Sequence, residues 1–276
     1  VLVCAEHTGI YGYDLQIWLD DMQISFAFVP ALEIKRSLGI RRGKNDAVDA
    51  LRIAEYAYIR RESISLSHKP SDVIFQLRAL LGERKQYVRM RAALLARKDA
   101  LHQYESKESI DRREKIIDKY AEYIASVDKQ MRGLMEHDDE IKRNYELISS
   151  VKCIGLVNAI NTLVYPNNFT SFQTPRQYAC YCGIAPFEHT SGTSIKGRTA
   201  VSKMGNQQLK CELTMAARSA IIHDPWMKQY YKRKMMSKGN APGAHGIVLN
   251  AIKFKLIVRM FSVVKSGIPY KVMAYC

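Results

Sequence analysis

The sequence lacks the features of a membrane protein or a secreted protein. It has no apolar run of the roughly 20 residues needed to cross a bilayer, and no amino-terminal signal peptide. Its six cysteines do not make a disulfide scaffold in a chain of 276 residues. Cys180 and Cys182 form a single C-x-C without a second pair, so buried thiols explain them better than a zinc site. We therefore expect a cytoplasmic protein with no membrane partner.

Acidic residues are scarce in the carboxy-terminal part. The chain carries a formal net charge of +15. Between Ser191 and Cys276, fifteen Lys and Arg residues stand against two acids, Glu212 and Asp224. A surface of this kind favours a polyanionic partner, of which nucleic acid is the commonest, and such binding weakens steeply with salt.

Residues 1–65 alternate between strand and helix patterns. Val1–Ala5 and Ile24–Val29 are short apolar runs typical of buried strands, and an amphipathic stretch from Tyr11 to Asp20 separates them. Asn45 is placed to cap a helix that runs to about Arg60. This order predicts an α/β layer. Because no strand precedes Val1, we expect the chain to begin inside a domain.

Residues 66–147 have the heptad spacing of two long helices. The first run comprises Ile74, Leu77, Leu81, Arg84, Val88, Arg91, Leu95 and Lys98. The second comprises Ile110, Arg113, Ile117, Tyr120, Ile124, Val127, Met131, Leu134, Asp138, Ile141, Tyr145 and Ile148. Such spacing predicts an antiparallel coiled-coil hairpin, an arm about 45 Å long. Arg84, Arg91 and Lys98 recur every seven residues and therefore lie on one side of the helix. Their charged groups either contact phosphates, or stay in water while the aliphatic parts of the side chains cover the seam between the helices.

Residues 148–276 are predicted to form a mostly helical domain punctuated by Gly and Pro. Trp226 is expected in its core, and Tyr230-Tyr231 to pack there or to stack on nucleic acid. The run Lys232-Arg233-Lys234 is expected to contact DNA or RNA phosphates. With the two earlier ranges, the chain is predicted to be a predominantly helical α+β protein.

Three carboxylates in the first range form a candidate metal site. Glu6 follows a strand, and Asp46 and Asp49 lie on one face of a helix start. Carboxylate oxygens at such a point would bind Mg²⁺, which can assist phosphodiester displacement. The alternative is that the two aspartates only complement the helix dipole.

A second candidate is Ser191, which precedes Gly192 in an expected loop. Lys196, Arg198 and Lys203 follow closely, and cations beside a serine can stabilise charge that develops when it attacks a phosphate. The alternative is an ordinary surface loop with a Gly205-Asn206 turn.

Five motifs together resemble one family. They are Glu6-x-Thr8-Gly9-x-Tyr11, Lys44-Asn45-Asp46-Ala47-Val48-Asp49-Ala50, Gly183-Ile184-Ala185-Pro186, Ser191-Gly192 and Ser202-Lys203-x-Gly205-Asn206. In this order and spacing they are similar to the DEDD-type insertion-sequence transposases. These are relatives of the Piv and MooV DNA invertases and include the bridge-RNA-guided recombinases.

The resemblance implies a domain organisation. Residues 1–65 would be the later part of a RuvC-like, RNase H-type domain and 66–147 the coiled-coil arm. Residues 148–276 would be the helical transposase domain, with a helix-hairpin-helix-like start near Cys153-Ile154-Gly155. The family usually has glycine at the first of these three positions, and we expect that Cys153 does not take a positive φ.

The resemblance also implies a chemistry. Glu6, Asp46 and Asp49 match the second, third and fourth of four Mg²⁺-binding acids, and the first belongs on a strand before Val1. Ser191 matches the family's serine nucleophile. The implied partners are DNA, a structured guide RNA in the guided members, and further protomers in a dimer or tetramer. Residues expected to contact nucleic acid are Lys44, Arg84, Arg91, Lys98, Lys196, Arg198, Lys203, Lys232, Arg233 and Lys234.

Three functions follow as hypotheses. The first is a Mg²⁺-dependent transposase that cleaves and rejoins DNA through Ser191. The second is a RuvC-like structure-specific nuclease that uses water and carboxylates alone. The third is an inactive nucleic-acid-binding and assembly fragment, which suits a chain without the first acid.

Overall fold

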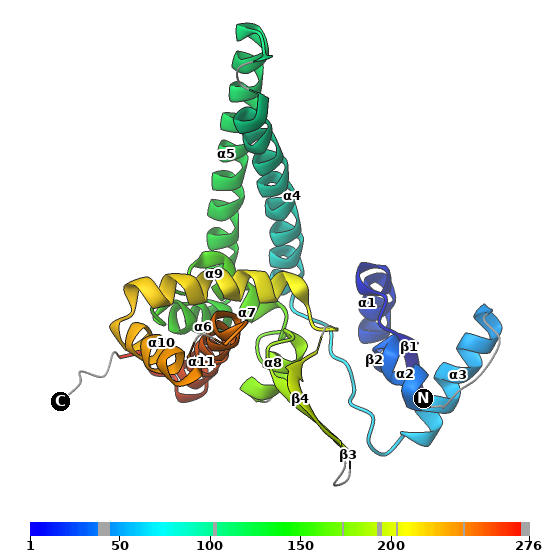
Figure 1. Ribbon diagram of the computed structural model, residues 1–276. Helices are drawn as coiled ribbons and strands as arrows, with labels where there is room; N and C mark the ends of the chain where they lie inside the picture. The colour runs from blue at the N-terminus through cyan, green and yellow to red at the C-terminus, as the bar shows by residue number, and fades with distance from the viewer. Residues whose placement is uncertain are drawn as a thin grey trace. The chain divides into compact units, whose positions relative to one another are not determined.

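The computed structural model describes residues 1–37, 45–101, 104–172, 174–191, 195–202, 204–239 and 241–271. By their internal contacts these residues form two units, Val1–Ser71 and Asp72–Cys276, and each is described by itself. The fold is predominantly helical α+β, as the sequence predicts (Figure 1). No helix in the described ranges is both long enough and apolar enough to cross a membrane.

The first unit contains a parallel strand pair with a helical crossover. β1 (Leu2–Glu6) pairs in parallel with β2 (Ser25–Val29), in the register that sets Leu2 opposite Ser25 and Glu6 opposite Val29. The connection is a short 3-10 turn, η1 (Gly9–Gly12), followed by α1 (Tyr13–Asp21). Both expected strands and the intervening helix are therefore confirmed, with ends shifted by one or two residues.

Two further helices complete the first unit, α2 (Ala31–Ser37) and α3 (Asp46–Ile59). The expected cap is present, since the Asn45 side chain accepts a hydrogen bond of 2.8 Å from the Val48 N–H. A small core of Ala27, Val29, Ile34 and Tyr56 joins these helices to β2. The Tyr56 hydroxyl donates to Glu33 Oε1 at 2.6 Å, and burial with this acidic partner raises the pKa of Tyr56 to about 12.

Two long helices open the second unit, α4 (Asp72–Leu101) and α5 (Lys107–Met135). They run antiparallel and side by side in Figure 1. The Ser106 side chain caps α5 by accepting from the Ser109 N–H at 3.3 Å. A continuous second run as far as Ile148 was expected, and this is wrong. The Asp138 carboxylate accepts from the Glu140 and Ile141 N–H groups and starts a separate helix, α6 (Asp139–Ser149).

The rest of the unit is helical apart from one hairpin. The elements are α7 (Leu156–Val164), α8 (Pro175–Tyr181), β3 (Pro186–Ser191), β4 (Ile195–Val201), α9 (Gln207–His223), α10 (Pro225–Lys238) and α11 (Ala244–Ser266). β3 and β4 are antiparallel. α11 is the central helix, because Ile252, Leu256, Ile257 and Met260 are each fully buried. The core also includes Ile74, Leu77 and Met131 from the near ends of α4 and α5.

Two local expectations are wrong. Cys153 adopts a φ of +71°, so the turn between α6 and α7 has a left-handed residue at the position where the family usually has glycine. Trp226 is half-buried at the edge of the core, where it contacts the cations Lys255 and Arg259 instead of apolar side chains alone.

Candidate functional site

The three candidate metal ligands lie on adjoining elements of the first unit. Glu6 is the last residue of β1, and Asp46 and Asp49 are in the first turn of α3, which contacts β1. Asp46 is exposed, while Asp49 Oδ1 accepts from Arg52 Nη1 at 3.0 Å. Among the described residues, no three His, Cys, Asp or Glu side chains are close enough together to hold a metal ion.

These carboxylates have the oxygen donors that Mg²⁺ prefers, but the described geometry does not assemble them into a metal site. The assignment of Glu6, Asp46 and Asp49 as metal ligands stays a prediction.

Ser191 is the last residue of β3. The register sets Ser191 opposite Ile195 and sets its neighbour Thr190 opposite Lys196, so the hairpin brings the backbone of Lys196 beside that of the serine. The side chains of Ser191, Lys196 and Arg198 lie outside the described residues, as do Lys44 and Lys203 and the side chain of Lys98. Their expected roles stay predictions.

The base of this hairpin is a close contact between two glycines. A Cβ placed on Gly205 would lie 2.2 Å from the Gly183 Cα, and Gly183 has a φ of +64°. Next to this contact the Asn206 N–H donates to the Tyr181 carbonyl at 2.8 Å, while the Asn206 side chain caps α9. Two motifs that are separate in the sequence therefore form one joint, which fixes where β3 begins and β4 ends.

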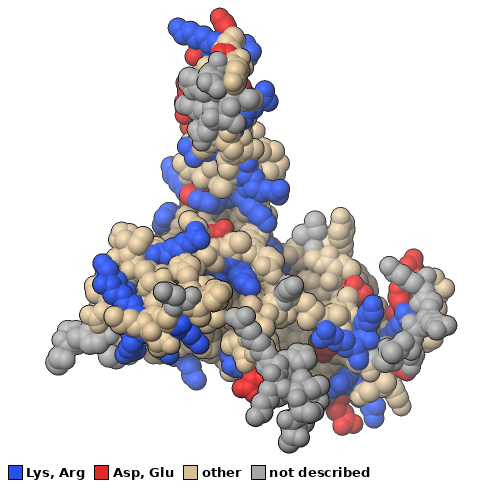
Figure 2. Space-filling view, viewed as in Figure 1, with Lys and Arg blue, Asp and Glu red and all other residues tan. Residues whose placement is uncertain are grey.

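The expected phosphate-contacting residues of α4 and α10 differ in their surroundings. Arg84 pairs with Asp128 of α5, through Nε at 2.6 Å and Nη2 at 3.3 Å. Arg91 is half-buried, and its Nε has no hydrogen-bond partner in the described part of the chain. On α10, Lys232, Arg233 and Lys234 are exposed, and the last two approach the Tyr230 ring. Figure 2 shows Lys and Arg spread over the visible face of this unit, with few acids beside them.

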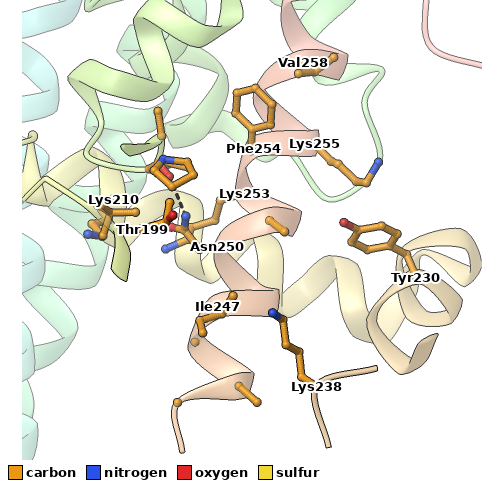
Figure 3. Close-up of a pocket in the computed structure, with 18 of the residues that line it drawn as sticks. Thr199, Lys210, Tyr230, Lys238, Ile247, Asn250, Lys253, Phe254, Lys255 and Val258 are labelled. Atoms are coloured by element: carbon orange, nitrogen blue, oxygen red, sulfur yellow. Dashed lines mark hydrogen bonds between the residues drawn. The ribbon is translucent and has the colours of Figure 1, made fainter. Parts of the chain in front are cut away.

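A cavity of about 1550 Å³ lies beside the hairpin, along α11 (Figure 3). Its cationic lining residues are Arg176, Lys210, Lys238, Lys253, Lys255, Arg259 and Lys271, and no acid is among the described residues that line it. None of these seven was singled out from the sequence. The available signal was the run Ile252-Lys253-Phe254-Lys255-Leu256, which sets two lysines inside an apolar stretch.

Two lysines of the cavity have unusual environments. Lys253 is only 6% exposed, and its Nζ lies 3.4 Å from Thr214 Oγ1. Burial and the positive charge of Lys210 lower the pKa of Lys253 to about 8. Lys255 Nζ lies 4.8 Å from the Trp226 ring centre and 4.6 Å from that of Tyr230. Burial, followed by nearby cations, lowers the pKa of Lys255.

Comparisons with known proteins agree with the five motifs. Residues 1–104 match the DEDD transposase model of the IS110 type, and residues 145–232 match the model described as "Transposase IS116/IS110/IS902 family". Two separate regions of the chain are therefore similar to domains of IS110-type transposases. The first match contains Glu6, Asp46 and Asp49, and the second contains Ser191 and the Gly183–Gly205 joint. α11, which carries Lys253, Lys255 and Arg259 of the cavity lining, lies outside both matches.

Relatives align with almost the whole length of the chain. The pilin gene-inverting proteins of Moraxella bovis and Moraxella lacunata are each 28% identical over 268 residues, which is 96% of this chain and 80% of theirs. An insertion element IS110 protein of 43.6 kDa from Streptomyces coelicolor is 28% identical over 159 residues, 56% of this chain and 38% of that protein. These similarities imply recombinase or transposase activity on DNA.

Proposed function

We propose that this IS110-type chain recombines DNA through a covalent intermediate on Ser191. The observation that carries the proposal is the position of Ser191 in the β3–β4 hairpin, whose base is fixed by the Gly183–Gly205 joint. The hairpin lies beside a cavity lined by seven cations and, in its described part, by no acid. The base of the hairpin, at Pro186 and Val201, lines this cavity, so the hairpin leads from a phosphate-attracting surface to the serine, which suits attack on a DNA backbone.

The reaction consists of two transesterifications. Ser191 Oγ attacks the phosphorus, a bond from phosphorus to one sugar oxygen breaks, and the departing oxygen takes up a proton to leave a strand end with a hydroxyl. The other strand end stays attached to Ser191 through its phosphate. The hydroxyl of a new strand end then attacks this phosphate and releases the serine. The bond energy is kept, so no nucleotide cofactor is needed.

The cations of the hairpin have an electrostatic role in this scheme. We propose that Lys196, Arg198 and Lys203 contact the phosphate under attack, where they would stabilise its developing charge. Lys44, Arg91, Lys98 and the Lys232–Lys234 run would hold the flanking backbone.

The carboxylates form a separate part of the proposal. We propose that Glu6, Asp46 and Asp49 hold Mg²⁺ in the assembled enzyme, where the ion would neutralise phosphate charge. The first unit would then be RuvC-like, which its parallel β1–α1–β2 arrangement supports. The α4–α5 pair would act as a coiled-coil arm that joins protomers into a dimer or tetramer. A structured RNA that pairs with DNA would supply target recognition.

Trapping the covalent intermediate tests the nucleophile. Purified protein is incubated with labelled DNA that carries the element's ends, and protein–DNA adducts are counted after denaturation. We expect the adduct to disappear in Ser191→Ala and recombination to fall by at least about a thousandfold. The matched control Ser237→Ala, on the exposed end of α10, should retain both.

The alternatives give different results in the same assay. If Ser191→Ala retains cleavage while Asp46→Asn loses it, the protein is a nuclease that uses water. If neither the parent chain nor the variants cleave, and salt-sensitive binding of DNA persists without Mg²⁺ binding, it is an assembly module.

A further inference from the structure

The cavity beside α11 has an apolar floor and two cationic walls. Ile247, Ala251, Phe254 and Val258 line it at intervals of three or four residues, so they share one face of α11. Ile247 is 43% exposed and Val258 is 38% exposed, which is unusual for large apolar side chains on a central helix.

The walls lie on opposite sides of α11 in Figure 3. One side carries Lys210 and Lys253 near Thr199 of β4, and the other carries Lys238, Lys255 and Tyr230. The volume of 1550 Å³ exceeds the range of about 300–1,000 Å³ that is usual for small-molecule sites. An extended ligand suits this cavity better than a compact metabolite.

The burial of Lys253 is not explained by a contribution to stability. Burying an ammonium group without an acidic partner is costly, and among the described residues Lys253 makes one hydrogen bond, to Thr214, which is long. An anion bound in the cavity would offset the free-energy cost of burying the ammonium group. Lys255 is supported by two aromatic rings instead of a carboxylate, so its positive charge is not neutralised by this contact.

We infer that this cavity binds an unpaired polynucleotide strand, with bases against the apolar face of α11 and phosphates at Lys210, Lys253 and Lys255. Apolar surface flanked by cations is the combination that binds single strands, because every base has an apolar face and every linkage an anion. A duplex hides its base faces and cannot reach a buried ammonium. The inference rests on the proposed function only for its place in the reaction, where β4 would lead the strand from Ser191 into the cavity.

The test uses the intrinsic fluorescence of the cavity. The chain has two tryptophans, so Trp18→Phe leaves Trp226, which lines the cavity, as the single reporter. A thymidine oligonucleotide of about 16 nucleotides is titrated into the full chain, and the uridine equivalent serves as the RNA arm. We expect saturable quenching of Trp226 by at least one of them, and the comparison shows whether DNA or RNA is preferred.

Lysine variants make the assignment specific. In the Trp18→Phe background, Lys253→Met should weaken binding about tenfold, the equivalent of one charge-assisted hydrogen bond. The slope of log affinity against log salt should fall by about 0.7. Because the variant removes a buried charge, its melting temperature should not fall, which separates lost binding from lost folding. Lys129→Met, on the exposed face of α5, removes the same charge outside the cavity and should change neither.

Three results would overturn the inference. One is unchanged affinity in both Lys253→Met and Lys255→Met. Another is a blunt duplex that binds equally well with the same dependence on Lys253. The third is displacement of the strand by polyglutamate of equal charge, which would assign the cavity to an acidic peptide. None of these results depends on Ser191, so they leave the nucleophile proposal to its own assay.

Discussion

Gly205 and Gly183 pack so closely that a Cβ on Gly205 would lie 2.2 Å from the Gly183 Cα and 2.2 Å from its nitrogen. Both obstructing atoms are backbone, so no side chain can move aside to make room. We expect Gly205→Ala to lower the free energy of unfolding by about 3 kcal/mol, at the upper end of overpacking costs. Urea unfolding followed by circular dichroism measures this, and recombination should fall as the hairpin base shifts.

Gly133 of α5 supplies the opposite control. It is helical and exposed, and a Cβ there would meet nothing within 4 Å. Gly133→Ala should therefore stabilise the chain by about 0.5–1 kcal/mol. If both alanine variants had the same effect, the Gly183–Gly205 contact would not be the cause.

Asp224 is expected to be the most sensitive carboxylate for folding. It is 1% exposed, its Oδ2 accepts from Arg259 Nη1 at 2.7 Å, and its Oδ1 caps α10 through the Trp226 N–H at 3.0 Å. Asp224→Ala would leave Arg259 without its acidic partner and should cost about 3–5 kcal/mol in urea unfolding.

The comparison variant is Asp138→Ala, which removes the cap of α6 at a half-buried position. It should cost only about 1 kcal/mol. Equal costs for the two aspartates would show that the Asp224–Arg259 pair contributes nothing beyond capping.

The stability of the chain should depend on pH through Lys253. Burial, then the charge of Lys210, lower its folded pKa to about 8 from the ordinary value of 10.5, and a charged Cys211 acts in the opposite direction. Between about pH 8 and 10.5 the unfolded chain holds a proton that the folded chain has released, so folding becomes more favourable as pH rises. Below pH 8 both forms are protonated and the burial cost is present in full.

Melting temperatures measured from pH 7 to 10.5 check this. The advantage of Lys253→Met over the parent chain should be largest near pH 7 and shrink above pH 8. Strand binding should weaken over the same range, because the neutral amine loses its charge for phosphate. If the difference in melting temperature between Lys253→Met and the parent chain stays constant with pH, Lys253 is not the group responsible for the pH dependence.

The sequence predicts local structure well where a residue's own chemistry decides it. The apolar runs around Val3 and Phe26 form the two strands, and Asn45 caps α3 because its side chain needs only the N–H groups that follow. The heptad count failed at Asp138, because the apolar spacing continues past a residue whose carboxylate caps the start of a new helix. A periodic pattern alone does not distinguish one continuous helix from two successive helices.

The candidate functional site is harder to predict from the sequence, because its contacts join residues that are far apart in the chain. Ser191 and Asp46 were identified by motif, whereas the Gly183–Gly205 joint depends on where two chain segments meet. The apolar neighbours of Lys253 in the sequence are a weak signal, and only packing shows that Lys253 is buried. Likewise Trp226 is large and apolar, but the cations beside it place it at a cavity edge.

The last prediction concerns the α4–α5 pair, where Arg84 donates two hydrogen bonds of 2.6 and 3.3 Å to Asp128. Their side chains are 24% and 27% exposed, so water screens the pair only in part. A double-mutant cycle with Arg84→Met and Asp128→Asn should give a coupling of about 0.5–1 kcal/mol. A coupling of zero would mean that the Arg84 stem, and not its charge, holds the two helices together.

Variants of Arg84 and Arg91 test whether these arginines of α4 contact phosphates or only cover the seam between the helices. A guanidinium already shared with Asp128 is less available to a phosphate than that of Arg91, whose Nε is buried and has no hydrogen-bond partner among the described residues. We therefore expect Arg91→Met to reduce the salt dependence of nucleic-acid binding more than Arg84→Met does. A larger effect of Arg84→Met would place the phosphate nearer Arg84. On binding, Arg84 would then have to exchange Asp128 for nucleic acid.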